Sequence, residues 1–344
     1  MRKVLVTGGA GFIGSNFVRF LLRKRRGIRV IVLDKLTYAG NLENLRDVLG
    51  RADVRFIHGD ICDGKLLDEL VPGTDIIFNF AAETHVDRSI LEAKSFVKTD
   101  ILGTFTLLQR AMKYKIPRFV QVSTDEVYGS IARGSFREDG ALQPNSPYSA
   151  SKSGADLLVR SFFKTYGLPV VITRSSNNYG PFQHPEKFIP LFITNAIEGK
   201  PLPIYGDGGN VRDWIYVEDN CRAIELVGRA GNVGEVYNVG AGEERTNVEI
   251  ARAIIERTGA DPGLLTFISD RPGHDRRYSV DARKTRRLGW ETQVGFEEGI
   301  ERTVRWYMRN ERWWRPVKEG KFKRYYARMY RNRIAEASRR KEKR

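Results

Sequence analysis

The sequence predicts a doubly wound α/β protein, in which helices cover both faces of a parallel sheet. Short, nearly continuous apolar runs alternate with amphipathic segments along the first half of the chain, as is typical of strands buried on both faces. A cluster of glycines follows the first of these runs directly. The alternation favours parallel strands, and right-handed crossovers then place helices on both sides of the sheet.

The expected elements of the first half follow in chain order. Strands rich in Val, Ile and Phe are expected at 3–7, 29–33, 54–57, 76–80, 119–122 and 170–173. Helices are expected between them at 12–24, 42–49, 64–70, 91–114 and 149–166.

The rhythm changes after about residue 176, where prolines and glycines interrupt the pattern and indicate a smaller, loop-rich α/β lobe. Beyond this point we expect a strand over 236–239 that rejoins the sheet, and helices over 247–258 and 297–311. The predicted units are a first domain of 1–175 with roughly 213–245, a second lobe of 176–212 and 246–314, and a tail of 315–344.

Composition excludes several classes of protein. The chain has 344 residues, of which 41% are hydrophobic and 29% charged, as in ordinary globular proteins. No apolar run approaches the roughly 18 residues of a membrane span, and the N-terminal residues do not resemble a secretory signal. Cys62 and Cys221 are the only cysteines, too few for a disulfide framework or a cysteine zinc site. We therefore expect a cytoplasmic location.

The net charge of +16 is concentrated at the C-terminus. Residues 315–344 contain 13 Lys or Arg against 3 Asp or Glu, so the remaining chain is only mildly basic. Phe322, Tyr325, Met329 and Ile334 recur in this tail at near-helical spacing. A basic amphipathic helix could bind an acidic partner, a membrane surface or RNA. We favour the alternative of a solvated helix packed on its own subunit or on a neighbour.

The glycine cluster has the spacing of a phosphate-binding loop. Gly8, Gly11 and Gly14 lie between the first strand and the first helix. They permit a tight turn, close approach of a diphosphate and close helix–strand packing, with the diphosphate at the positive end of the helix. Asp34 lies 20 residues after Gly14, where a carboxylate binds a ribose 2′-hydroxyl and repels a 2′-phosphate. This pattern predicts a Rossmann-type domain that binds NAD rather than NADP, and its context disfavours a ligand-free glycine turn.

Tyr148 and Lys152 form a second motif, with both side chains on one face of a predicted helix. A free tyrosine titrates near 10, so we expect the nearby ammonium and a positive nicotinamide to lower the pKa of Tyr148. The phenolate could then take a proton from a hydroxyl as hydride leaves its carbon, while Lys152 holds the nicotinamide ribose. The alternative is that Tyr148 and Lys152 form a surface pair by chance, and the glycine loop in the same chain disfavours it.

The glycine spacing resembles that of the short-chain dehydrogenase/reductase superfamily, especially its extended branch. Residues 59–61 and 79–82 resemble that branch's adenine contact and the loop beside its cofactor. The resemblance implies these cofactor contacts: Gly8, Gly11, Phe12, Ile13, Gly14, Asp34, Lys35, Thr37, Asp60, Ile61, Ala81, Ala82, Thr84, Thr99, Tyr148, Lys152 and Asn178.

Two adjacent acids narrow the resemblance to one group of enzymes within the extended branch. Asp125 and Glu126 follow the fifth strand, at the sheet edge where ligands bind, and offer separate acid and base roles if their pKa values differ. Acids of a solvated loop are the alternative. Over roughly 1–314, the chain resembles the dTDP-glucose 4,6-dehydratases, nucleotide-sugar enzymes of deoxysugar biosynthesis. Further matches lie at 36–41, 83–89, 177–181, 205–208, 212–214 and 271–275. Epimerases of the same branch generally lack both acids.

The resemblance implies a mechanism with five catalytic residues, including Lys152. Tyr148 removes the proton of the sugar 4-hydroxyl while C4 gives hydride to NAD, and Thr124 binds the resulting carbonyl oxygen. Glu126 then removes the C5 proton, and Asp125 protonates the C6 oxygen so that water leaves. Return of hydride to C6 and reprotonation of C5 give a 4-keto-6-deoxy sugar.

Substrate contacts are also implied by the resemblance. They are Thr84, His85, Thr124, Asn177, Lys187, Phe188, Pro203, Tyr205, Arg212, Asn247, Arg271 and His274. Among them Arg212 and Arg271 match contacts to the diphosphate and nucleotide, and residues 203–205 match the segment near the base. A homodimer packed through helices 91–114 and 149–166 is expected on the same ground.

Some features depart from the family or carry no chemistry. Asp100 stands where the family usually has Asn, which puts one hydrogen bond in doubt because a carboxylate cannot donate. His58 and His184 are expected to be structural or exposed, and no cluster has metal-ligand spacing, so we predict no metal. The rival functions are a dehydratase or C4 epimerase for a UDP- or GDP-linked sugar, and a non-catalytic NAD-binding protein whose tail binds nucleic acid.

Overall fold

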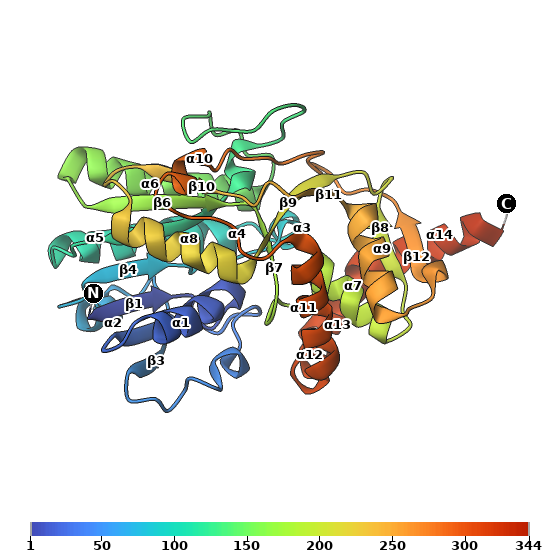
Figure 1. The fold of residues 1–344 in the computed structure, drawn as a ribbon, viewed down its shortest axis with the longest axis horizontal. Helices are drawn as coiled ribbons and strands as arrows, with labels where there is room; N and C mark the ends of the chain where they lie inside the picture. Colours follow the sequence, from blue (N-terminus) through green and yellow to red (C-terminus); the bar gives the residue numbers. More distant parts are fainter. Residues whose placement is uncertain (1, 343–344) are drawn as a thin grey trace.

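The computed structural model describes residues 2–342 and contains a parallel seven-stranded sheet, ordered β10-β6-β5-β4-β1-β2-β3 (Figure 1). Its strands are β1 (Lys3–Thr7), β2 (Arg29–Asp34), β3 (Val54–His58), β4 (Ile76–Asn79), β5 (Phe119–Thr124), β6 (Val170–Ser175) and β10 (Val236–Val239). The prediction of a doubly wound parallel sheet is confirmed, and the strand at 236–239 rejoins the sheet beside β6. Strand order reverses between β1 and β4, which creates the crevice where such sheets bind ligands.

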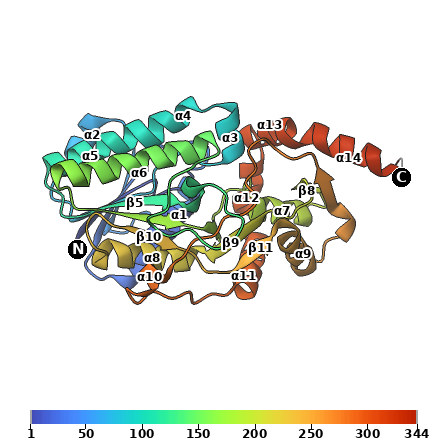
Figure 2. The same ribbon diagram turned by 90° about the horizontal axis from the view of Figure 1, so that it is seen from above.

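Helices cover both faces of this sheet, as Figure 2 shows. One face carries α1 (Phe12–Lys24) and α8 (Val217–Ala230), and the other carries α2 (Gly64–Leu70), α5 (Thr104–Lys113) and α6 (Pro147–Tyr166). A capping box formed by Ser146 and Ser149, with Pro147 in the first turn, starts α6 two residues earlier than the apolar pattern indicated.

The expected single helix over 91–114 is wrong. The chain instead forms α3 (Val86–Leu91), α4 (Lys94–Phe96) and a π-helical turn, Val97–Gly103, that leads into α5. Single π turns of this kind are frequent at functional sites. Here the turn contains Asp100, whose buried carboxylate accepts hydrogen bonds from the Glu83 backbone (2.8 Å) and the Ser151 hydroxyl (2.6 Å).

Two other expected helices also differ. The segment expected as a helix over 42–49 forms only a short 3₁₀ turn, Leu42–Leu45, capped by the side chain of Asn41. The helix expected over 297–311 is divided at Asn310 into α11 (Phe296–Arg309) and α12 (Glu311–Lys318). Between β10 and α11 lies the short α10 (Arg283–Arg286).

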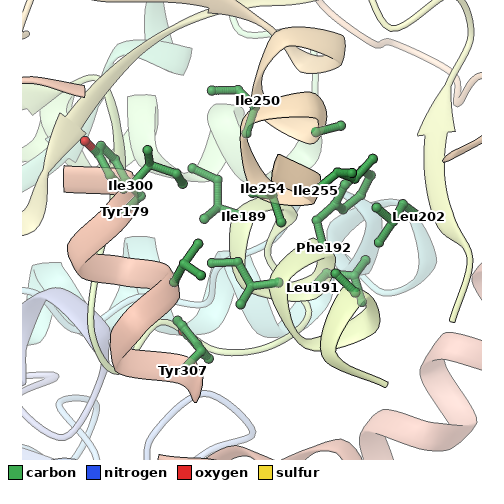
Figure 3. Close-up of a cluster of buried hydrophobic side chains, with 14 of the residues drawn as sticks. Tyr179, Ile189, Leu191, Phe192, Leu202, Ile250, Ile254, Ile255, Ile300 and Tyr307 are labelled. Atoms are coloured by element: carbon green, nitrogen blue, oxygen red, sulfur yellow. The ribbon is translucent and has the colours of Figure 1, made fainter. Parts of the chain in front are cut away.

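A smaller set of elements packs beside the large sheet. Its strands are β7 (Asn177–Tyr179), β8 (Leu202–Tyr205), β9 (Val211–Tyr216), β11 (Glu244–Thr246) and β12 (Leu265–Ile268), and its helices include α7 (Phe188–Ile197) and α9 (Asn247–Thr258). Strand β9 pairs with β7 and β11, and β8 pairs with β12. Figure 3 shows Phe192 of α7, Ile254 of α9 and Ile300 of α11 facing one shared apolar interior.

The C-terminal tail packs on this second core. After α12 it continues through α13 (Lys321–Tyr326), a π-helical turn, Ala327–Arg331, and α14 (Asn332–Glu342). Phe322, Tyr325 and Tyr330 are buried and belong to the same apolar cluster as α7, α9 and α11. The favoured expectation of a tail packed on its own subunit therefore agrees with the structure. Within residues 2–342, no helix combines the length and apolar character needed to cross a membrane.

Candidate active site

Two adjoining cavities lie beside the carboxyl ends of the sheet strands. The first is lined by every predicted cofactor contact except Asn178, which lines the second. The second is lined by every predicted substrate contact except Thr84, which lines the first, and Thr124. Gln183, Glu186 and Lys187 line both cavities, so the two form one continuous site.

The glycine loop forms a cradle in the first cavity. A Cβ at Gly8 would lie 2.6 Å from the backbone nitrogen of Ala81, and one at Gly14 would overlap the Gly8 carbonyl, so both glycines permit close packing. A Cβ at Gly11 would meet only the Gly8 oxygen, at 3.2 Å. Gly11 also caps α1 without a side-chain hydrogen bond, which leaves N–H groups of the first helical turn for a ligand's oxygens. This cradle fits a diphosphate.

Asp34 is fixed at the ribose end of the same cavity. Its two oxygens accept hydrogen bonds from the backbone nitrogens of Ala10 (2.9 Å) and Leu36 (2.8 Å). Burial raises the pKa of Asp34, while these backbone N–H groups lower it. Nearby, the Lys35 ammonium lies 2.8 Å from the Asp60 carboxylate and is thereby partly neutralised. A carboxylate in this position fits a ribose diol and disfavours a 2′-phosphate, so the cavity fits NAD.

Tyr148 and Lys152 lie on α6 at the wall of the first cavity, where the Tyr148 phenol hydrogen-bonds Thr124. In the protein alone Lys152 does not bring the pKa of Tyr148 down, and the expected effect of a bound nicotinamide on that pKa stays a prediction. Desolvation, followed by the carboxylates of Glu126 and other nearby acids, raises that pKa well above its ordinary value. The Lys152 ammonium instead donates to the backbone carbonyl of Val122 at 2.9 Å.

Asp125 and Glu126 differ in their surroundings. Asp125 is 2% exposed, and its Oδ2 atom has no hydrogen-bond partner among the described residues. Desolvation and the neighbouring Glu126 raise the pKa of Asp125 well above its ordinary value and so favour the protonated form of this carboxyl group. Glu126 lines the second cavity; desolvation raises its pKa, but Arg271 and Lys187 oppose the shift. The two acids thus suit a proton donor and a proton acceptor, respectively.

The surroundings of Asp100 explain how the chain accommodates Asp where the family usually has Asn. Both of its hydrogen bonds are accepted, from the Glu83 backbone and from Ser151, so no donor is needed at this position. Burial raises the pKa of Asp100 to about 6, although Lys152 opposes the shift. Burial and then the charge of Asp100 raise the pKa of Glu83 to about 7.

The second cavity presents fixed cations. Arg271 donates to Asp87 at 2.8 Å, Arg212 donates to the backbone carbonyl of Asp275 at 2.9 Å, and Lys187 donates to Thr84 at 2.9 Å. In the part of the chain that the structure describes, Asn177 Oδ1 and Gln183 Oε1 are buried without a hydrogen-bond partner. Cations with free polar atoms beside them suit a polar anionic ligand such as a nucleoside diphosphate.

Comparison with known proteins shows the family to which the chain belongs. The model of the GDP-mannose 4,6 dehydratase family matches residues 5–303. A dTDP-glucose 4,6-dehydratase from Streptomyces niveus is 51% identical over 321 residues, covering 92% of this chain and 96% of that protein. The chain belongs to the dTDP-glucose 4,6-dehydratase family.

Two further similar proteins extend the comparison. The low-salt glycan biosynthesis protein Agl12 of Haloferax volcanii is 56% identical over 305 residues, covering 89% of this chain and 98% of that protein. A crystal structure of the dTDP-glucose 4,6-dehydratase DesIV from Streptomyces venezuelae, solved with NAD bound, superposes with a TM-score of 0.91 at 54% identity. The superposition covers 92% of this chain and 100% of the DesIV chain.

Several residues that line the two cavities of this protein were not predicted from its sequence. Gln183 and Glu186 line both cavities, and Glu186 accepts from Arg88 at 2.8 Å. His184, expected to be structural or exposed, lines the first cavity with its ring 5.7 Å from that of Tyr38. The only signal in the sequence was their place just before Lys187, which was predicted as a substrate contact. Tyr330 of the tail also lines the second cavity, and no motif marked it.

Proposed function

We propose that this protein is a dTDP-glucose 4,6-dehydratase that binds NAD and converts its substrate to dTDP-4-keto-6-deoxyglucose by eliminating water. The observation that carries the proposal is the pair of unlike acids, Asp125 and Glu126, whose charges both act on the Tyr148 phenol. Tyr148 lines the first cavity and Glu126 the second, while Asp125 is buried and lines neither. The family relationship supports the same substrate and cofactor.

NAD, when bound, accepts hydride from C4 of the sugar and supplies hydride to C6. The glycine cradle would hold its diphosphate, and Asp34 would hold the adenosine ribose. Tyr148 would accept the proton of the sugar 4-hydroxyl once the positive charges of Lys152 and of a bound nicotinamide offset the desolvation that raises its pKa, and Thr124, which hydrogen-bonds Tyr148, orients the same oxygen. Lys152, held by the Val122 carbonyl, keeps a positive charge beside the reacting groups.

The acids complete the elimination of water. The new C4 carbonyl acidifies the C5–H bond, and Glu126 removes that proton because Arg271 and Lys187 support its charged form. Asp125, whose protonated form burial favours, donates its proton to the C6 oxygen, which leaves as water. Return of hydride to C6 is then completed by return of a proton to C5. Each positioned proton transfer contributes about 10²–10⁴-fold to the rate. Arg212 and Arg271 bind the diphosphate and nucleotide of the substrate.

One assay tests this function. We expect the purified protein, supplied with NAD and dTDP-glucose, to release a product lighter than its substrate by one water, measured by mass spectrometry. An epimerase would conserve the mass, and a non-catalytic NAD-binding protein would leave dTDP-glucose unchanged. Faster turnover of UDP-glucose or GDP-glucose would reassign the nucleotide. Faster turnover of either of these two sugars would contradict dTDP-glucose as the substrate.

The proposal also covers the domain organisation of the chain and its location in the cell. We assign cofactor binding to residues 1–175 with roughly 213–245 and substrate binding to 176–212 with 246–314, followed by the tail. The location we propose is the reducing cytoplasm, which suits the two free cysteines, Cys62 and Cys221.

A homodimer is the proposed assembly, and its interface is testable. Large apolar side chains stand exposed on the outer face near α5 and α6; Val97 is 53% and Leu157 55% exposed. We expect the wild-type protein to sediment as a dimer and Leu157→Glu to sediment as a monomer, because a charge would be buried at the interface. Val233→Glu, at a residue 40% exposed outside these helices, is the control and should remain dimeric. A monomeric wild type, or a dimeric Leu157→Glu protein, would contradict this interface.

A further inference from the structure

The tail reaches the substrate cavity. Tyr330 is 5% exposed and lines the second cavity together with Tyr205, Arg271 and His274. Its ring centroid lies 6.0 Å from that of Tyr205, within the range of an aromatic pair. A basic tail segment thus supplies one wall of the cavity at the end lined by Tyr205.

Arg333 follows Tyr330 by three residues on the helical path of the tail, so the two side chains lie on the same side. Its guanidinium carbon lies 5.3 Å from the centroid of the Tyr205 ring. Its Nη1 atom is buried and has no hydrogen-bond partner, and no carboxylate in the described part of the chain forms an ion pair with it. Arg333 does not itself line the second cavity but lies against Tyr205, which does. Because buried donors are normally satisfied, this nitrogen is suited to an oxygen of a ligand that reaches past the Tyr205 ring.

The tail is also anchored to the loop between the two cavities. The Tyr325 hydroxyl lies 3.2 Å from Nδ1 of His85, whose Nε2 lies 3.2 Å from the Glu186 carbonyl oxygen. The Arg88 guanidinium lies 4.5 Å from the ring centroid of Tyr325 and 3.7 Å from that of Tyr38. Figure 2 shows α13 running beside α3, where these contacts are made. The tail therefore has a defined position over the site.

We propose that the C-terminal segment 319–342 is part of the nucleotide-sugar site, with Tyr330 packing against the bound nucleotide and Arg333 donating a hydrogen bond to one of its oxygens. This inference rests on the proposed function. The family model ends at residue 303, so the segment lies outside the part of the chain that the model matches. Tyr330 and Arg333 are accordingly specificity-determining residues of the site in this proposal.

Calorimetric titration of the NAD-loaded full-length protein with dTDP tests the segment. We expect Arg333→Ala and Tyr330→Ala each to raise the Kd for dTDP at least about tenfold, since each removes a contact to the nucleotide. Tyr330→Phe keeps the ring and should stay within about threefold of wild type. Arg331→Ala removes the same charge from an exposed position and should leave the Kd within about twofold.

The outcomes separate this inference from the proposed function. If wild-type protein binds dTDP and neither alanine variant weakens binding, the inference is overturned while the proposed function stands. If Arg331→Ala weakens binding as much as Arg333→Ala, the tail acts only by its overall charge, which also overturns the inference. If wild-type protein does not bind dTDP, the proposed substrate is wrong, and the nucleotide contacts of the tail are wrong with it.

Discussion

Glu126→Gln is expected to lower the rate of water elimination by about 10²–10⁴-fold while leaving the affinity for dTDP within about twofold of wild type. The amide has nearly the shape of the carboxylate but cannot accept the C5 proton. In the wild-type protein, Arg271 and Lys187 support the charged form of Glu126 against desolvation. The measurement is product mass over time from dTDP-glucose in deuterated water. Wild type should incorporate deuterium at C5, and the variant should return substrate without it.

Glu291→Gln provides the matched control, because Glu291 is exposed and outside both cavities. It should turn over at the wild-type rate. If Glu126→Gln retained normal elimination and normal exchange at C5, another group would have to remove that proton. Asp125 could not easily replace it, since burial and the neighbouring carboxylate favour its protonated form.

Local motifs explain why much of the fold and cofactor site could be predicted. Gly8, Gly11 and Gly14 fall on one strand–helix turn, and Asp34 ends the neighbouring strand, so short-range pattern and parallel pairing place them together. Tyr148 needs only helical spacing and the position of α6 on one face of the sheet. These placements depend on backbone geometry that strand and helix periodicities already describe.

Features that depend on distant packing could not be predicted in this way. The π-helical turn at Val97–Gly103 is tied to contacts made elsewhere: a Cβ at Gly103 would lie 2.6 Å from a side-chain carbon of Ile61. The raised pKa of Tyr148 results from burial and from acids on separate elements. Tyr330 enters the substrate cavity only because the tail folds back over the second core.

Tyr148→Phe should lower kcat by at least about 10²–10⁴-fold, because the ring remains but the oxygen that accepts the 4-hydroxyl proton is lost. The ring centroid lies 6.2 Å from that of Phe96 in an edge-to-face contact, which phenylalanine preserves, so the thermal unfolding midpoint should hardly change. Steady-state kinetics with dTDP-glucose measure kcat, and calorimetry measures the Kd for dTDP, which should stay within about twofold of wild type.

Tyr166→Phe, at the exposed end of the same helix, removes the same hydroxyl far from the cavities and should leave kcat unchanged. A Tyr148→Phe protein with a normal kcat would require a different acceptor for the 4-hydroxyl proton. A selective rise in the Kd for dTDP, with kcat unchanged, would instead make Tyr148 a binding residue. A fall in kcat alone is the result that acid–base chemistry at Tyr148 requires, because the phenol then acts on the reacting hydroxyl and not on the bound nucleotide.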